Sequence, residues 1–473
     1  VAELRTQLCA LAEQALMAYE AREACTLDDA EAHAAAHAAF AHARPALLRP
    51  LLAIGRADRA FALAEHHRDF HTLVELCFAD AHEEKEDAKR IKLMQAPPPA
   101  AVVRVEAYLD TYGMDFANEL YQHYIRHGAL RRLMEPQPRH AALVSAFLDA
   151  HPQYGRLAWV HDTALGAYDH ARHTLRSTAD AERLDVEAKQ RMLSLGKLMH
   201  LATLPRMDDA LVPAQQAALE AWDDALDLGH IQHRLHQRWS DAAWIDAQTP
   251  PEAQAEAIAS AVAPLLSERP ALRMLFVSLA RDVMAGLVVG GEDMMDLLTL
   301  TDRSFAAPPE APLTDLAIAA QVFVRLDTPT PARREAALAS LWRRLFLMDD
   351  WEALSDTTSM TDDQVLHNVQ GTVAFHTLQS VLADASTAST LMAPESVCAL
   401  PPPSVSLLAE RLQGLPDAHI EAIHAALQDE HEALVHIVRH TKLSAYFAHI
   451  LSVRDDIVPE DEALMPGASD MVL

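Results

Sequence analysis

The stretch from Asp115 to Gly128 constrains the fold most, because its apolar residues fall on two helical stripes. Residues spaced by three or four positions share one face of a helix. These residues are Phe116, Leu120 and Tyr124 on the first stripe, and Tyr121 and Ile125 on the second. Two stripes require two buried faces, as in a helix packed between neighbours. We expect Asp115 to cap this helix and Gly128 to end it.

The composition of the whole chain favours helices. Half of the 473 residues are hydrophobic and only 13 are glycine. A β-rich fold needs more turn glycines and more β-branched and aromatic residues, and we identify no convincing strand. Short helical segments separated by Gly, Asp or Pro are typical of stacked helices, and no fixed repeat period is visible. We predict an all-α fold without a sheet, an irregular elongated α-solenoid or stacked helical bundle.

Two proline-rich segments divide the chain into three expected blocks. They are Ala96-Pro-Pro-Pro99 and the stretch from Pro205 to Pro213. The resulting blocks are an N-terminal helical stack over 1–95, a central helical block over 96–205, and a C-terminal helical block over 206–473 that ends in a frayed acidic tail. Since the chain begins at Val1 without a methionine, we expect that a preceding part is missing.

The N-terminal block begins with an expected amphipathic helix from Val1 to about Glu23. Its apolar stripe consists of Leu4, Leu8, Leu11, Ala15 and Tyr19. Further along, we expect Pro45 and Pro50 to interrupt the helical structure, because proline lacks the donor that an interior helical position needs.

Charge and cysteine content limit the partners and the compartment. The net charge is −29, from 68 acidic and 39 basic residues. Such a surface repels nucleic acid and anionic lipid, so we expect no direct contact with either. The four cysteines are scattered, which favours free thiols in the cytosol or nucleus. No apolar run approaches the length of a membrane span, and no secretory signal is present.

Histidine is the residue type that most suggests chemistry, with 26 in the chain. Groups at helical spacing could ligate zinc, although a catalytic site also needs a third ligand and an open position. The groups are His33 and His37; His67 and His71; His230, His233 and His236; and His431, His436 and His440. The segment from His431 to His436 has one residue too many for H-E-x-x-H. We interpret these histidines as solvated or helix-capping and predict no catalytic residue, metal or cofactor; a histidine-dependent metallohydrolase is the enzymatic alternative.

Paired charges and tryptophans also have simpler interpretations. We expect the acidic pairs Asp223-Asp224 and Asp349-Asp350 at exposed helix edges. The basic pairs Arg333-Arg334 and Arg343-Arg344 are expected on a solvated helix face. Most tryptophans are expected in the core, with a minority at an interface.

The spaced apolar positions resemble one nucleoporin family over about Arg56 to Leu201. The matching positions are Arg59-Ala-Phe-Ala-Leu-Ala-Glu65, Asp69-Phe70, Leu73-Val74, Asp115-Phe116, Leu120-Tyr121, Tyr124, Gly128, Leu133, Phe147-Leu148, His151, Leu157-Ala-Trp159-Val-His161, Ala171, Thr174-Leu175, Lys189 and Leu193-Ser-Leu-Gly-Lys-Leu198. The segment resembles the C-terminal α-helical domain of the hundred-and-thirty-three-kilodalton nucleoporin of the Y-shaped nuclear pore scaffold. After Pro205 the sequence is Pro-richer and the resemblance fades.

The resemblance implies a non-catalytic scaffold of the nuclear pore complex at the nuclear envelope, which supports nucleocytoplasmic transport. It also implies end-on docking to the C-terminal helical domain of the neighbouring stalk nucleoporin, of the hundred-and-seven-kilodalton class, beside other Y-complex members. The implied interface residues are Leu120, Tyr121, Tyr124, Ile125, Leu130, Arg131, Leu133 and Met134. The same residues equally suit contacts between stacked helices, and a vesicle-coat or tethering solenoid shares the expected architecture.

Overall fold

The computed structural model describes residues 2–78, 99–204, 212–243, 249–303, 313–326, 330–356 and 360–455. Within these ranges every element is helical and none is a strand, which confirms the all-α prediction. By its internal contacts the chain divides into two units, Val1–Leu175 and Arg176–Leu473. The boundaries expected near residues 95 and 205 lie outside the described ranges, so the three-block division stays a prediction.

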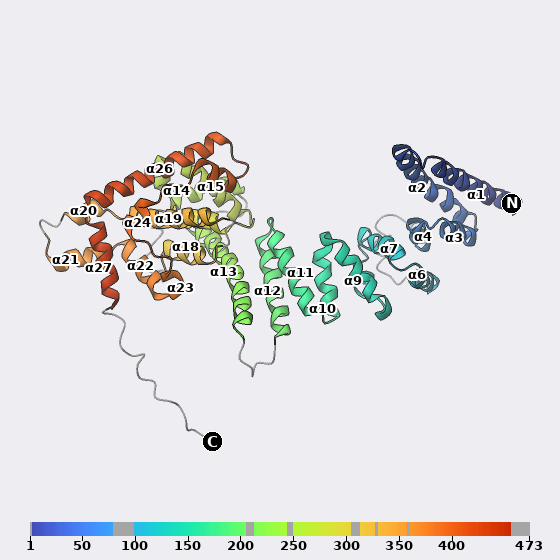
Figure 1. Ribbon diagram of the computed structural model, residues 1–473, viewed down its shortest axis with the longest axis horizontal. Helices are drawn as coiled ribbons and strands as arrows, with labels where there is room; N and C mark the ends of the chain where they lie inside the picture. Colours follow the sequence, from blue (N-terminus) through green and yellow to red (C-terminus); the bar gives the residue numbers. More distant parts are fainter. Residues whose placement is uncertain are drawn as a thin grey trace, which may run out of the picture. The chain divides into compact units, whose positions relative to one another are not determined.

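The N-terminal unit is a succession of short helices, coloured blue to teal in Figure 1. They are α1 (Ala2–Cys25), α2 (Ala30–Ala53), α3 (Ala57–His66), α4 (Phe70–Cys77), α6 (Pro99–Tyr112), α7 (Met114–Arg126), α8 (Leu130–Met134), η2 (Pro138–His140), α9 (Ala141–Ala150), η3 (Pro152–Tyr154), α10 (Gly155–Ala164) and α11 (Tyr168–Ala181), whose end crosses into the second unit.

Helix α7 is buried on two sides, as its two stripes predict. It packs against α4 and α6 and also against α8 and α9. Phe116 and Leu120 of one stripe and Tyr121 of the other are almost fully buried. Gly128 has φ 70° just beyond the helix, a conformation that favours glycine and confirms the predicted stop. The predicted cap is wrong: Gly113 is the N-cap residue, and Asp115 lies in the first turn of the helix, where its negative charge is favourable near the helix N-terminus.

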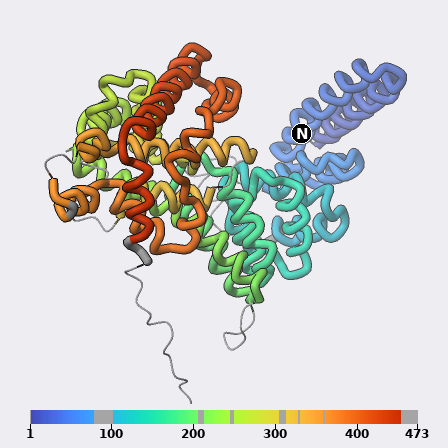
Figure 2. Tube along the Cα trace, turned by 60° about the vertical axis from the view of Figure 1, so that its left-hand side comes forward, coloured from blue at the N-terminus to red at the C-terminus, as the bar shows by residue number. Residues whose placement is uncertain are grey.

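Two expectations for the N-terminal helices are wrong. The predicted helix forms as α1, but it buries Cys9, Ala12 and Leu16 against α2. Of the predicted stripe, Ala15 and Tyr19 are half-buried, whereas Leu4, Leu8 and Leu11 are exposed. Figure 2 shows these two helices running alongside each other. Helix α2 continues through Pro45 and Pro50 instead of stopping. Its residues Leu48 and Leu51 are buried in the core, so tertiary packing overrides the local cost of proline.

The C-terminal unit begins at Arg176, within α11. Its elements are α12 (Val186–Thr203), α13 (Pro213–Ala242), α14 (Pro251–Val262), η4 (Pro264–Glu268), α15 (Pro270–Met284), α16 (Gly291–Thr299), α18 (Asp315–Val324), α19 (Pro331–Leu347), α20 (Trp351–Ser355), α21 (Asp362–Gln370), α22 (Val373–Ala383), α23 (Ala385–Ala388), α24 (Pro394–Ala399), α25 (Val405–Arg411), α26 (Asp417–His440) and α27 (Leu443–Asp455). Helix α19 begins with Pro331 as expected, and Thr330 caps it.

Helices α12 and α13 approach closely at two glycines. A Cβ atom at Gly196 would overlap the indole ring of Trp222, and one at Gly229 would overlap the side chain of Gln190. Trp222 is buried and carries the Arg176 guanidinium at 5.4 Å from its ring centroid. The absent side chains at these two positions therefore set the spacing of the pair.

A buried ion network joins four helices of the C-terminal unit. Asp296 of α16 accepts from Arg344 of α19 at 2.6 Å and from Arg411 of α25 at 2.5 Å. Glu430 of α26 accepts from Arg344 at 3.3 Å. Burial alone raises the pKa of Asp296, but the charges of Arg411 and Arg344 outweigh it and hold that pKa below its usual value. Because the network is largely removed from water, each charge is stabilised mainly by the opposite charges beside it.

The expectation of a solvated face for Arg343-Arg344 is therefore wrong. Both side chains are buried, and Arg343 donates to the carbonyl oxygen of Leu400 at 3.2 Å. Asp349 is buried as well, and accepts from the backbone N–H groups of Val373 and Ala374 at the start of α22. These charged side chains therefore hold parts of the fold together, through contacts with residues far away in the sequence.

The tryptophans are largely core, as expected. The indoles of α13, α19 and α20 are buried, namely Trp222, Trp239, Trp342 and Trp351. Trp159 is partly buried, and Trp244 lies outside the described residues. Among the described helices, none combines the length and hydropathy that spanning a membrane requires.

We expect Asp296→Ala to lower the free energy of unfolding by about 3–5 kcal/mol, because it leaves two buried guanidinium groups without their shared carboxylate. Urea denaturation followed by far-UV circular dichroism measures the change. The control is Asp282→Ala, which removes a more exposed partner of Arg281 and should cost about 0–1 kcal/mol. Equal losses in the two variants would show that the network contributes nothing beyond a surface pair.

His71 of α4 and Glu119 of α7 form a second testable pair, 3.1 Å apart. The Glu119 hydrogen bond raises the pKa of His71 above its ordinary value, against the opposing effect of burial. Because the pKa of His71 is raised in the folded chain, the pair stabilises the fold fully below about pH 6.5, the pKa of an unfolded histidine. This stabilisation is lost as the pH rises through the pKa of His71 in the folded chain. Since both groups are partly exposed, solvent screening limits the gain to about 0.5 kcal/mol.

We therefore expect His71→Gln to be less stable than the unchanged chain at about pH 5.5 and equally stable at about pH 8.5. Thermal unfolding at both pH values measures the difference. Glu119→Gln should remove the same pH-dependent increment. A stability gap of constant size across this range would contradict the assigned titration.

Candidate docking surface

A groove in the N-terminal unit collects several residues of the predicted interface. It has a volume of about 390 Å³ and lies between α6, α7 and the segment from α8 to η2. We call it the α6–α8 groove. Its lining consists of Phe78, Ala101, Val102, Val105, Glu106, Leu109, Leu120, Tyr121, Tyr124, Arg131, Arg132, Glu135, Pro136, Gln137 and His140. The surface is mostly apolar with charges at its edge, which suits a protein partner.

The predicted interface residues divide into floor, core and rim. Leu120, Tyr121 and Tyr124 are buried but line the groove as its floor. Leu133 is fully buried and does not line it, while Ile125 and Met134 pack partly buried against the same core. Leu130 is 38% exposed, and the side chain of Arg131 is 86% exposed. Leu130 and Arg131 are therefore the most exposed of the predicted interface residues.

Aromatic contacts fix the floor of the groove. Tyr121 meets Phe147 of α9 edge-on at 5.4 Å between ring centroids, and Tyr124 meets Phe78 at 5.9 Å. Burial raises the pKa of Tyr124 to about 12, so its phenol stays neutral. Within the described residues the buried hydroxyl of Tyr121 has no hydrogen-bond partner. The floor is therefore rigid and apolar, with one unused polar group.

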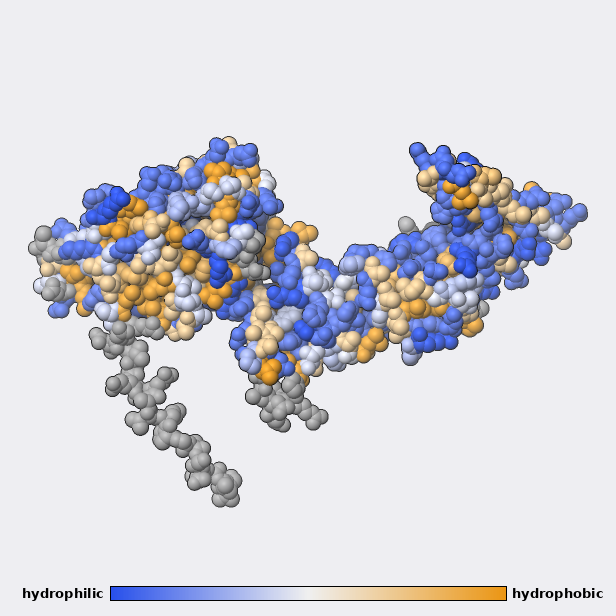
Figure 3. Space-filling model, viewed as in Figure 1, coloured by the Kyte–Doolittle hydropathy of each residue, from blue (hydrophilic) through white to orange (hydrophobic). Residues whose placement is uncertain are grey.

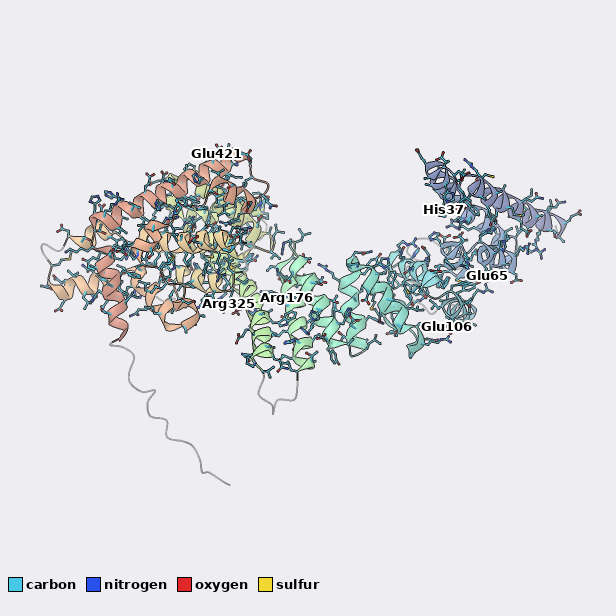
Figure 4. The ribbon with its side chains drawn as sticks, viewed as in Figure 1. His37, Glu65, Glu106, Arg176, Arg325 and Glu421 are labelled. Atoms are coloured by element: carbon cyan, nitrogen blue, oxygen red, sulfur yellow. The ribbon has the colours of Figure 1, made fainter. Side chains whose placement is uncertain are left out.

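The rim carries paired charges of both signs. Arg131 contacts Glu135 at 3.0 Å, and Glu106 accepts from Arg139 at 3.1 Å and from Gln137. Figure 4 shows Glu106 on α6. His140 lies 2.8 Å from Asp110. Pairs at this exposure contribute little to stability, so they are available to orient a partner by charge.

Sequence reasoning missed the α6 wall of the groove. Val102 lines the groove and is 36% exposed, although it is strongly apolar. Its neighbour Val103 is 67% exposed but does not line the groove. Two adjacent β-branched residues shortly after a proline run were the available signal, because a surface helix usually carries polar residues there. In the space-filling view, apolar patches interrupt the hydrophilic surface of this unit (Figure 3).

The histidine groups are dispersed among other roles. His33 and His37 both contact Glu23, through its carbonyl and its carboxylate respectively. His436 stacks near His440 with ring centroids 4.5 Å apart. In the part of the chain that the structure describes, no group of three or more His, Cys, Asp or Glu side chains is arranged to hold a metal ion.

Comparison with known proteins identifies the family. The sequence profile described as "Non-repetitive/WGA-negative nucleoporin C-terminal" matches residues 2–449. The chain belongs to this nucleoporin family. The match spans both units, including the region after Pro205 where the resemblance was expected to fade.

The curated relatives agree with this assignment. Nucleoporin nup132 of Schizosaccharomyces pombe is 25% identical over 400 residues, which cover 80% of this chain and 31% of that protein. Nuclear pore complex protein Nup133 of Danio rerio is 31% identical over 166 residues, covering 35% and 13%. This nucleoporin chain thus spans about a third or less of the length of these relatives.

Solved structures show only a loose likeness to this nucleoporin chain. The Nup170 CTD of Chaetomium thermophilum aligns with 97% of this chain and 96% of that one, at 14% identity and a TM-score of 0.30. The assignment to the family therefore depends on the sequence.

We expect Tyr121→Phe to leave the free energy of unfolding unchanged or to raise it by up to about 1 kcal/mol, because it removes a buried hydroxyl without a partner. Urea denaturation measures the effect. The matched control is Tyr108→Phe, which removes a hydroxyl that donates to Glu65 at 2.5 Å and should cost about 1.5–3 kcal/mol. A comparable loss in both variants would mean that the Tyr121 hydroxyl is satisfied.

Proposed function

We propose that this chain is a non-catalytic scaffold segment of the nuclear pore Y complex at the nuclear envelope. It would dock end-on to the C-terminal helical domain of the neighbouring stalk nucleoporin, of the hundred-and-seven-kilodalton class, and so support nucleocytoplasmic transport alongside other Y-complex members. Membership of the nucleoporin family supports the proposal, as do relatives named as nuclear pore complex proteins. Such a role needs no cofactor.

The observation that carries the docking proposal is the α6–α8 groove with Leu130 and Arg131 beside it. The apolar floor is held in place by packing with α9, so a partner helix would not need to order it. An exposed leucine next to an exposed arginine is a common composition for the centre and rim of an interface. A helix of the partner is a suitable occupant, since the apolar side chains on one face of a helix can fill such a groove.

Exposed residues give the sharper test. Charge substitution at Tyr124 or Leu133 would disrupt the core, because both are buried. We expect Leu130→Asp with Arg131→Glu to keep the fold and to weaken the complex with the stalk nucleoporin's C-terminal domain by roughly tenfold or more. Size-exclusion chromatography with light scattering, followed by isothermal titration calorimetry, measures stoichiometry and affinity.

The matched control is Leu165→Asp with Arg156→Glu, the same charge changes on the exposed surface around α10 of the same unit. It should bind like the unchanged chain. A complex unaffected by the groove-side substitutions would move the interface away from the groove. If the unchanged chain forms no complex at micromolar concentration, the docking partner is wrong and a coat or tethering scaffold gains support.

A further inference from the structure

A second, larger concavity lies wholly within the C-terminal unit. Its volume is about 890 Å³, and residues from α11 to α13 form one side of it. The segment before α16, the ends of α18 and α25 and the start of α19 form the other side. We call it the α12–α16 cavity. Its volume is in the range of sites that hold small molecules.

Two loops hold these sides together through the main chain. Val186 N–H donates to the Gly286 carbonyl oxygen at 3.0 Å, and Val288 N–H donates to the Arg183 carbonyl oxygen at 3.1 Å. The amide of Gln232 on α13 reinforces them by donating to Leu287 O and accepting from Val289 N–H. The cavity is therefore a built feature with hydrogen-bonded edges.

Basic residues predominate in the cavity although the chain carries a net charge of −29. The lining contains six basic side chains: Arg176, Arg183, Lys189, Arg325, Arg333 and Arg411. It contains four acidic ones, and each is paired with one of these arginines. The pairs are Asp180 with Arg176, Asp224 with Arg325, Glu292 with Arg333, and Asp293 with Arg411. Outside the lining, Asp227 also pairs with Arg325 and Asp296 with Arg411.

Two cations remain after this pairing. Arg183 donates to the main-chain carbonyl of Glu182, and neither Arg183 nor Lys189 forms an ion pair within the described part of the chain. Burial lowers the pKa of Lys189, and repulsion from Arg183 and Arg176 lowers it further, against partial compensation by Asp180 and Glu182. Among the described residues, Arg183 and Lys189 are therefore the two cavity cations without a direct carboxylate ion pair, although Asp180 and Glu182 lie near enough to raise the pKa of Lys189.

A neutral hydrogen-bond donor in the same cavity also lacks an acceptor. Gln190 lines the cavity one residue after Lys189, and its buried Nε2 has no acceptor among the described residues. A buried donor without an acceptor costs about 1–3 kcal/mol. An anion with several oxygen atoms would satisfy this amide and the two cations together.

We propose that the α12–α16 cavity binds a compact small molecule that carries several phosphate groups. Its basic residues come from five separate segments, α11 and the turn after it, α12, the end of α18, α19 and α25, and converge on one volume. Figure 4 labels two of them, Arg176 and Arg325. This arrangement suits a ligand charged on several sides better than an extended acidic peptide, which needs a linear track of cations.

Isothermal titration calorimetry of the intact chain with inositol hexakisphosphate tests the proposal. We expect one-to-one binding at micromolar concentration and physiological ionic strength, and no binding of uncharged inositol. Arg183→Gln with Lys189→Gln should weaken binding by roughly tenfold or more. Vesicles containing a phosphorylated phosphatidylinositol form a second arm; co-sedimentation assigns a lipid headgroup, and binding of the soluble probe alone assigns a free phosphate compound.

The control is Lys197→Gln, which removes the same charge from the same helix outside the cavity, where Lys197 pairs with Asp223. It should bind the probe normally, and thermal unfolding verifies that every variant is folded. The proposal is overturned if the chain does not bind the probe, or if the control weakens binding as much as the cavity variants. If an oligoglutamate peptide binds as tightly as the probe, the ligand class would be an acidic peptide segment and the phosphate proposal would be wrong.

Discussion

The arrangement of the C-terminal unit depends on a network of ion pairs whose charges replace the hydration that each of them loses on burial. Asp296, Arg344, Arg411 and Glu430 come from four different helices; Arg411 is half-buried and the other three are buried. Each ion alone would lose several kcal/mol of hydration, which the others replace only at short distance and good geometry. The helices α16, α19, α25 and α26 are therefore fixed relative to one another by more than apolar contact. The network specifies the arrangement, because a displaced helix would leave charges without partners.

Local signals in the sequence predicted the helices well and their environment less well. Gly128 ends α7 and Pro331 begins α19, since each depends on backbone conformation within a few residues. The partners of Arg344 are 48 and 86 residues away in sequence. No periodicity reports such contacts, so two adjacent arginines suggested a solvated face. The stripe of Leu4, Leu8 and Leu11 failed similarly, because α2 packs on the neighbouring face that carries Leu16.

The candidate docking surface was also only partly predictable, because local patterns do not report which elements meet in space. The family resemblance implied Tyr121 and Tyr124 as interface residues, and both line the α6–α8 groove; the two stripes of α7 indicated only that they lie on buried faces of the helix. The stripes do not separate a residue that contacts the next helix from one that faces a groove, as Leu133 shows by its complete burial. The α6 wall was missed although α6 directly precedes α7 in the sequence, because the pattern of apolar residues does not show whether a helix face lines a groove or meets a neighbouring helix. The net charge of −29 likewise gave no indication of the α12–α16 cavity, whose own lining contains six basic and four acidic side chains.

The close crossing of α12 and α13 gives this chain an optical property. Trp222 lies against Gly196 on one side and near the guanidinium of Arg176, which lines the α12–α16 cavity. An indole so confined is shielded from water, and its emission depends on the charge beside its ring. Any event that moves or neutralises Arg176 would shift the fluorescence of Trp222. The fold thus places an intrinsic fluorophore beside a residue of the cavity lining, so a ligand that displaces Arg176 would alter the tryptophan emission without an attached label.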